Sequence, residues 1–80
     1  MDTQIEVADD VIFRFKGDTI IEVFQSEDVE LDEPVEESFA KDEEIEVTIF
    51  GIDEHKYDVQ FGDGTVSFIR KDLLDIVSIN

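Results

Sequence analysis

The chain has 80 residues, no cysteine and a formal net charge of −17 at pH 7, with 23 acidic residues against six lysines and arginines. A chain this short forms one small domain with a thin core, and without cysteine it has no disulfide and no thiolate site. Its charge opposes binding to nucleic acids and anionic membranes and favours basic protein partners. With no secretory leader and no apolar run of roughly 20 residues, we expect a soluble, cytoplasmic protein.

The first predicted unit, residues 1–25, is an N-terminal β-hairpin. Two β-rich runs within 11–25 meet at Gly17-Asp18, a pair typical of a two-residue hairpin turn. In that register Phe15 would face Ile20, and apolar residues would lie on both faces. The pattern therefore indicates a hairpin that is covered on both sides or curled into a barrel, with a short strand over 4–8 before it.

The second unit, residues 26–44, is a predicted acidic loop followed by a short helix. Residues 27–44 hold ten carboxylates, which only Lys41 offsets. Pro34 suits the first position of a helix, and the spacing of Val35 and Phe39 places them on one helical face. The spacing predicts a helix of about two turns over 34–41, with Phe39 buried and the acids held on an ordered frame.

The third unit, residues 45–80, reads as a barrel-like β segment. Ile45, Val47 and Ile49 alternate with polar residues, as in a half-buried strand, and a second alternating run follows over 57–61. A glycine-rich turn over 62–64, a returning strand, one helical turn over 71–74 and a last strand complete it. The predicted fold class is mainly β: a single domain forming a small SH3-like or Tudor-like bent barrel of about five to six antiparallel strands, with the short acidic helix inserted near 34–41.

The run VTIFGIDEHKYDVQFGDGTVSFIRKDLLDI, residues 47–76, resembles Tudor-like and other SH3-like barrels. The resemblance implies binding of methylated lysine or arginine by an aromatic cage. Tyr57 and Phe61 fall on the apolar face of their strand, however, and are interpreted as core residues. In size and charge the whole chain resembles the small acidic DNA-mimic proteins, many of them phage-encoded, that inhibit DNA-binding proteins of the host. If this chain is phage-encoded as well, the resemblance implies that it acts in the cytoplasm of the bacterial host.

The sequence offers no recognisable catalytic or cofactor site, and we expect neither an enzyme nor a metalloprotein. His55 is the only histidine, and no nucleophile motif accompanies it. The acidic stretch has Glu33 and Phe39 where an EF-hand loop needs glycine and glutamate. No phosphate-binding P-loop and no dinucleotide-binding glycine motif occurs.

The predicted partner-binding site is the dense acidic window. Its eleven members are Glu27, Asp28, Glu30, Asp32, Glu33, Glu36, Glu37, Asp42, Glu43, Glu44 and Glu46. Phe50 falls on the otherwise polar face of its strand and is a candidate self-contact or partner anchor, so a homodimer is plausible. Three turn residues, Asp18, Asp53 and Asp63, are expected to lie outside the acidic cluster.

The sequence is compatible with three functions. The first is a DNA mimic that occupies the DNA-binding surface of a basic protein without binding nucleic acid or membrane. A histone-like nucleoid protein such as HU is the first candidate partner, ahead of a restriction enzyme, a glycosylase or a polymerase subunit. The others are a Tudor-like adaptor that binds a basic peptide tail and an acidic regulatory subunit without mimicry.

Overall fold

The structure is a computed structural model that describes residues 5–25 and 33–80. These residues form seven strands and one short 3₁₀ turn, η1 (Lys71–Leu73). The strands are β1 (Asp10–Phe15), β2 (Thr19–Phe24), β3 (Val35–Phe39), β4 (Glu44–Ile52), β5 (Lys56–Phe61), β6 (Val66–Arg70) and β7 (Leu74–Ile79).

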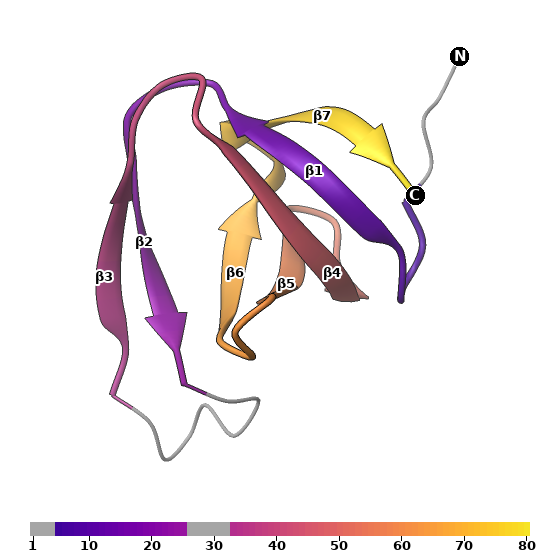
Figure 1. The fold of residues 1–80 in the computed structure, drawn as a ribbon, viewed down its shortest axis with the longest axis horizontal. Helices are drawn as coiled ribbons and strands as arrows, with labels where there is room; N and C mark the ends of the chain where they lie inside the picture. The colour runs from indigo at the N-terminus through magenta and orange to yellow at the C-terminus, as the bar shows by residue number, and fades with distance from the viewer. Residues whose placement is uncertain (1–4, 26–32) are drawn as a thin grey trace.

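All seven strands belong to one sheet, in the order β3-β2-β6-β5-β4-β1-β7, and each neighbouring pair is antiparallel. The sheet bends strongly over itself but does not close, so that β3 and β7 are its edges (Figure 1). The prediction of a mainly β, bent antiparallel fold is confirmed. The strands are more numerous than the five to six expected, because the middle segment contributes one as well.

Gly17-Asp18 does not form the predicted hairpin turn. β1 pairs with β4 and β7, whereas β2 pairs with β3 and β6. The chain instead turns a corner between β1 and β2 and continues as an arch (Figure 1). The reason lies in the side chains: Phe13, Phe15 and Ile21 are all buried, and a two-residue hairpin would place Phe15 and Ile21 on opposite faces. The corner keeps every odd-numbered side chain of both strands toward one core.

The chain between β3 and β4 turns the same corner, so the β1–β4 pair and the β2–β3 pair are the two halves of one long bent ribbon. At the corner Phe15 N donates to Glu43 O at 3.0 Å, and Asp42 N donates to Phe15 O at 2.9 Å. Asp18 Oδ1 accepts the Lys41 backbone N–H at 2.8 Å. Asp42 has a φ of 71°, a left-handed conformation that aspartate tolerates better than most residues. We call the two halves the β1/β4 arm and the β2/β3 arm.

The predicted helix over 34–41 is wrong: residues 35–39 are strand β3, paired in register with β2 from Thr19↔Phe39 to Val23↔Val35. A separation of four residues places two side chains on the same side of a strand as well as of a helix. Phe39 is half-buried and stacks on Phe15 with ring centroids 4.7 Å apart. Val35 remains 52% exposed, because β3 extends past the core.

The core lies beneath the arch, between its two arms and the β5–β6 pair. Its buried apolar residues are Val11, Phe13, Phe15, Ile21, Val23, Ile45, Val47, Ile49, Val59, Val66, Ile69 and Leu74. The predicted alternation over 45–49, the turn over 62–64, the helical turn and the last strand are confirmed. A register shift between Ile49 and Gly51 interrupts the pairing of β4 with β5, and β4 continues to Ile52. Residues 5–9 are not a strand, and Gln4 lies outside the described residues.

Candidate functional site

Seven of the eleven predicted acidic site residues are described, and all seven are exposed. They are Glu33, Glu36, Glu37, Asp42, Glu43, Glu44 and Glu46. The other four, Glu27, Asp28, Glu30 and Asp32, lie outside the described residues. The described part of the window thus displays its carboxylates to solvent from β3, the corner and β4.

The strand register divides these carboxylates between two faces. Even-numbered side chains of the arch point outward, so Glu36 of β3 and Glu44 and Glu46 of β4 lie on its outer face. Glu37 points to the inner side, yet it is exposed because the edge strand β3 overhangs the core. Glu43 belongs to the corner, where its Oε1 accepts the Ala40 backbone N–H at 3.0 Å.

Glu22 and Glu36 lie directly opposite each other on the outer face of the β2/β3 arm. Like charges at directly opposed positions destabilise a sheet, and neither residue has an ion pair within the described part of the chain. The predicted site omitted Glu22. Its alternation with the buried Ile21 and Val23 is the sequence signal that could have placed it on this face.

On the β1/β4 arm the acidic residues form a partly compensated row. Arg14 of β1 lies between two acidic register neighbours: it is opposite Glu44 of β4 on one side and opposite Asp75 of β7 on the other. Glu46 lies opposite the apolar Ile12. Asp10 was also omitted from the predicted site, although it lies on this face and accepts a hydrogen bond from Thr48 Oγ1 at 2.7 Å.

Most of the basic side chains are held by partners within the molecule. Lys16 Nζ lies 3.9 Å from Asp75 Oδ1, and Arg70 pairs with Asp72. Lys56 Nζ lies 5.4 Å from the ring centroid of Phe68, and Lys71 Nζ lies 5.1 Å from that of Tyr57. These contacts occupy the cations locally and leave the outer carboxylates largely uncompensated.

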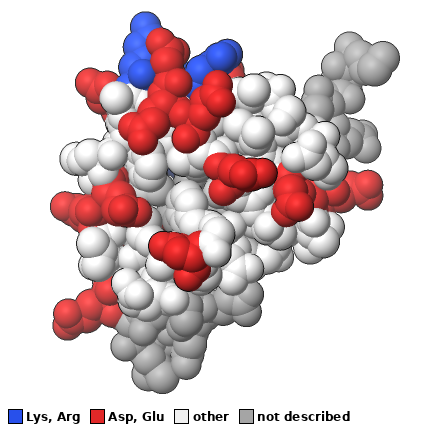
Figure 2. All heavy atoms as spheres, viewed as in Figure 1, with Lys and Arg blue, Asp and Glu red and all other residues white. Residues whose placement is uncertain are grey.

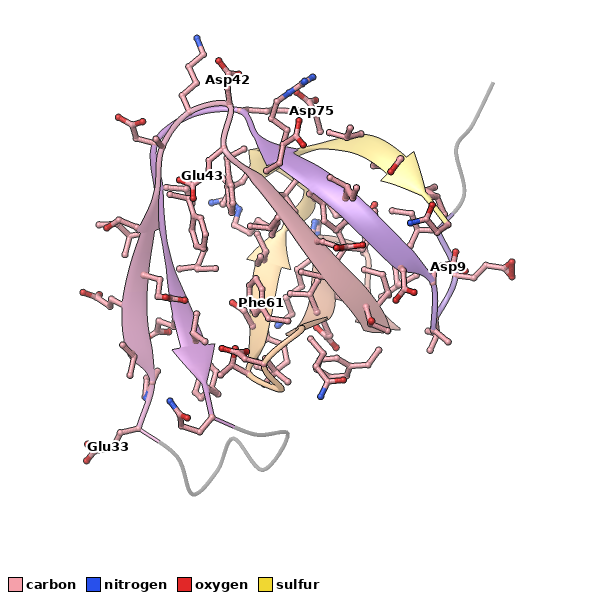
Figure 3. The ribbon with its side chains drawn as sticks, viewed as in Figure 1. Asp9, Glu33, Asp42, Glu43, Phe61 and Asp75 are labelled. Carbon is pink, nitrogen blue, oxygen red and sulfur yellow. The ribbon has the colours of Figure 1, made fainter. Side chains whose placement is uncertain are left out.

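The carboxylates extend over the whole length of the arch. Figure 2 shows acidic side chains spread across the face that carries β3, β4 and β1, with basic side chains gathered at one end. In Figure 3, Glu33 lies at the free end of the β2/β3 arm, Asp42 and Asp75 lie near the corner, and Asp9 lies at the opposite end. The surface is therefore broader than the predicted window.

The three turn acids differ in their surroundings. Asp53 accepts backbone hydrogen bonds from His55 and Lys56, which lower the pKa of its carboxyl. The hydroxyl and backbone N–H of Thr65 likewise lower the pKa of Asp63. Both residues are turn caps, as expected. Asp18 is not separate from the acidic cluster, because it bonds to the corner and lines the same hollow as Glu43.

Phe50 lies on the outer face as predicted, but it is neither fully exposed nor on an edge strand. β4 lies between β5 and β1, and the Phe50 ring meets Phe68 edge-on at 6.2 Å between centroids. Phe68 in turn contacts Phe24 at 5.8 Å. Phe50 thus packs within a half-buried aromatic cluster, and its role as a self-contact or anchor stays a prediction.

Tyr57 and Phe61 pack against the core, as the sequence indicated. The Tyr57 ring stacks on Phe13 with centroids 5.1 Å apart, and burial raises the pKa of its hydroxyl. Asp58 points outward beneath Gly51, where burial raises the pKa of its carboxyl. Its Oδ1 atom is buried and has no hydrogen-bond partner among the described residues.

Over residues 5–25 and 33–80, no three His, Cys, Asp or Glu side chains are arranged to hold a metal ion. No helix in this part of the chain is long and apolar enough to cross a membrane. No protein-family model matches the chain, and comparison with curated proteins and with solved structures gives no significant match. The charge and geometry of the surface are therefore the basis for a functional proposal.

Proposed function

We propose that this protein is a DNA mimic that binds the nucleic-acid-binding surface of a basic protein and blocks its access to DNA. The observation that carries the proposal is the acidic outer face of the arch. It retains Glu22 directly opposite Glu36 and two further glutamates along β4. Such like-charge pairs cost stability, and a partner that supplies cations would offset that cost.

The spacing of these carboxylates suits a surface that normally contacts phosphates. Alternate side chains on one face of a strand lie about 6.7 Å apart, which is about twice the axial spacing of phosphates along one DNA strand. Glu44 and Glu46 form such a pair on β4, and the Glu22–Glu36 pair places a second group on the other arm. In the proposed complex these two acidic rows, one on each arm of the bent frame, would take the places of the two backbones of a duplex.

A histone-like nucleoid protein of the HU type is the first candidate partner, because its contact with DNA is broad and independent of sequence. A pattern of surface charge can then compete with DNA for this partner without reproducing the hydrogen-bonding groups of the bases. A restriction enzyme, a glycosylase or a polymerase subunit offers a similar basic surface. A pull-down from bacterial lysate at low and high salt would identify the partner, and retention should fall as salt rises.

The deciding experiment measures displacement of a labelled DNA duplex from the partner at constant ionic strength. The double variant Glu36→Lys/Glu46→Lys should weaken the free energy of binding to the partner by about 1–3 kcal/mol, and displacement should fall accordingly. Single exposed pairs contribute up to about 1 kcal/mol each, and charge reversal also adds repulsion. Reversal at position 36 removes the repulsion from Glu22, so the fold should be retained.

The matched control is Glu6→Lys/Glu54→Lys, which makes the same change in net charge at exposed positions outside the two acidic rows. It should weaken displacement much less than the first variant does. If both variants weaken displacement equally, net charge alone is responsible and the arranged mimic surface does not exist. In that case an acidic regulatory subunit without mimicry becomes the better interpretation.

A further inference from the structure

The outer edge of β3 is open to an added strand. β3 pairs with β2 on one side, and no strand of the described residues pairs with its other side. Figure 1 shows it at the free margin of the β2/β3 arm. An edge strand presents unpaired backbone N–H and C=O groups, which are the groups used when an extended peptide adds to a sheet.

Charge selects the kind of strand that this edge would accept. Glu36, Glu37 and Ser38 are exposed along β3, and Glu22 lies beside Glu36 on the neighbouring strand. A second copy pairing through β3 would bring glutamates of both copies together, which like-charge repulsion opposes. A strand with lysine or arginine at alternate positions would instead place its cations on one face, and on the inner face they would lie beside Glu37.

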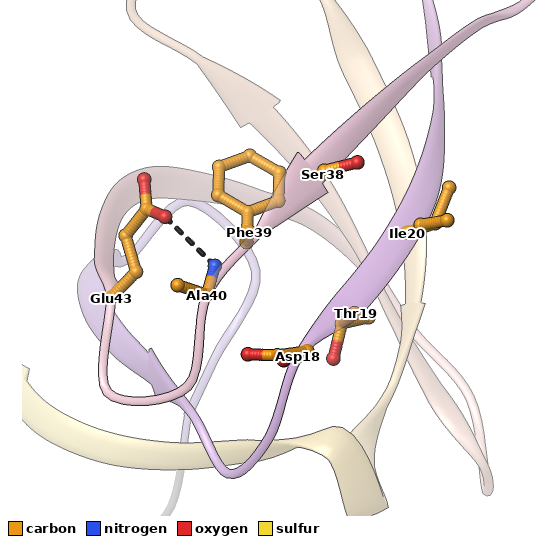
Figure 4. Close-up of a pocket in the computed structure, with 7 residues that line it drawn as sticks. All are labelled: Asp18, Thr19, Ile20, Ser38, Phe39, Ala40 and Glu43. Carbon is orange, nitrogen blue, oxygen red and sulfur yellow. Dashed lines mark hydrogen bonds between the residues drawn. The ribbon is translucent and has the colours of Figure 1, made fainter.

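A hollow of about 560 Å³ adjoins the C-terminal end of β3 (Figure 4). The Phe39 ring and Ile20, which is 64% exposed, give it an apolar surface. Asp18 and Glu43 supply carboxylates, which their hydrogen bonds to the backbone N–H groups of Lys41 and Ala40 hold in place. The remaining lining residues are Thr19, Ser38 and Ala40.

The chemistry of this hollow matches a lysine or arginine side chain. Such a side chain has an apolar stem that can cover the Phe39 ring and a cationic head that can reach the carboxylates of Asp18 and Glu43. The aromatic ring adds an attraction for the cation itself. Ser38 and Phe39 of β3 line the hollow, so a segment that pairs with the end of this strand is close enough to place a side chain in it.

We propose that β3 binds an extended basic segment of the partner by strand addition, with one lysine or arginine of that segment seated in the hollow. The inference rests on the proposed function only in taking the partner to be basic. It goes further because it requires an extended backbone in the bound segment, whereas a purely electrostatic mimic would accept any basic surface.

The test uses two synthetic peptides of equal length and charge. One alternates lysine with valine, and the other alternates lysine with proline, which cannot donate backbone hydrogen bonds to β3. Fluorescence anisotropy should show at least tenfold tighter binding of the valine peptide, with slowed amide exchange over residues 35–39. Equal affinities, or protection confined to other strands, would overturn the proposal.

Variants of the protein locate the binding. Glu37→Lys should weaken binding of the valine peptide at least fivefold, and Asp18→Asn, which removes one carboxylate of the hollow, should weaken it by a smaller factor. Glu54→Lys, with the same charge change as Glu37→Lys, should have little effect. A dimer of the protein that protects the same amides would overturn the choice of a basic segment as the occupant.

The two proposals can fail separately. If DNA displacement responds to the Glu36 and Glu46 reversals while the two peptides bind equally, the mimic stands and strand addition is wrong. If the valine peptide binds at β3 and no DNA is displaced from a basic partner, strand addition stands and the mimic is wrong.

Discussion

At the scale of single residues, Asp58 differs most from a solvated carboxylate among the acidic side chains that the structure describes. It lies on the outer face of β5, opposite Phe68 and beneath Gly51, and one of its oxygens has no partner within the described chain. Burial raises the pKa of its carboxyl above the ordinary value near 3.8, against the lowering effect of Lys56. The ionised form of Asp58 therefore lowers the stability of the folded protein relative to the protonated form.

This setting predicts that Asp58→Asn stabilises the protein at neutral pH. A carboxyl whose pKa is higher in the folded chain favours folding while protonated, and that contribution is lost as pH rises through the folded pKa. Asparagine removes the cost of the ionised form, so the melting temperature at pH 7 should rise by a few degrees. Thermal melts should show the gain shrinking as pH falls toward 4. A gain independent of pH would contradict this explanation.

Gly51 is expected to be required because of the same carboxylate. A Cβ placed on Gly51 would collide with the Asp58 side chain, so Gly51→Ala should destabilise the fold by about 1–3 kcal/mol. Asp58→Ala removes most of the obstruction. Denaturant unfolding of both single variants and the double variant should therefore show that Gly51→Ala costs less stability in the Asp58→Ala background than in the original chain. Additive costs would show that the two residues act independently.

At the scale of elements, β3 depends on one aromatic contact for its attachment to the core. Phe39 stacks on Phe15, whereas Val35 at the other end of the strand is half exposed. The glutamates between them face solvent. The strand is thus anchored at the corner and is weakly held along the rest of its length, which suits an edge that accepts another strand.

Phe39→Ala should cost about 1–3 kcal/mol of folding stability, less than a fully buried phenylalanine, because the ring is only half-buried. Amide exchange over residues 35–39 should accelerate more than exchange in β5 and β6. Val35→Ala, in the same strand and mostly exposed, should cost less than about 0.5 kcal/mol. Equal costs for the two substitutions would show that the stacking contact does not anchor β3.

At the scale of the whole molecule, the net charge of −17 on 80 residues makes self-repulsion a general cost of folding. The described ion pairs involve exposed side chains, so they offset little of it. Raising NaCl from low concentration to 0.5 M or more shortens the screening length from about 30 Å toward about 3 Å. The unfolding temperature should rise over this range.

Binding to the proposed basic partner should show the opposite salt dependence, because the same screening weakens attraction between the two proteins. Differential scanning fluorimetry and a binding titration over one NaCl series would test both signs. A potassium chloride series of the same ionic strengths is the control for specific ion effects. Stability that falls with salt would mean that attractive pairs outweigh repulsion in the folded state.

Several features of this protein follow from the sequence by itself. The alternation of Ile45, Val47 and Ile49 with polar residues indicates one buried face, and the structure buries all three. The glycine-rich turn over 62–64 and the last strand were likewise predicted, because turn chemistry and strand periodicity are local properties of the chain. The exposure of the described acidic window follows from the cost of burying a charge.

The tertiary structure alone decided which strands become neighbours. The pattern around Gly17-Asp18 predicts a hairpin and that around Val35 and Phe39 predicts a helix, yet the structure has a corner and an edge strand there. Backbone hydrogen bonds between β2 and β3, and the need to bring Phe15 and Ile21 to one core, override the local signals. Glu22 meets Glu36 for the same reason: local periodicity determines which face a side chain occupies, whereas long-range pairing determines what lies beside it.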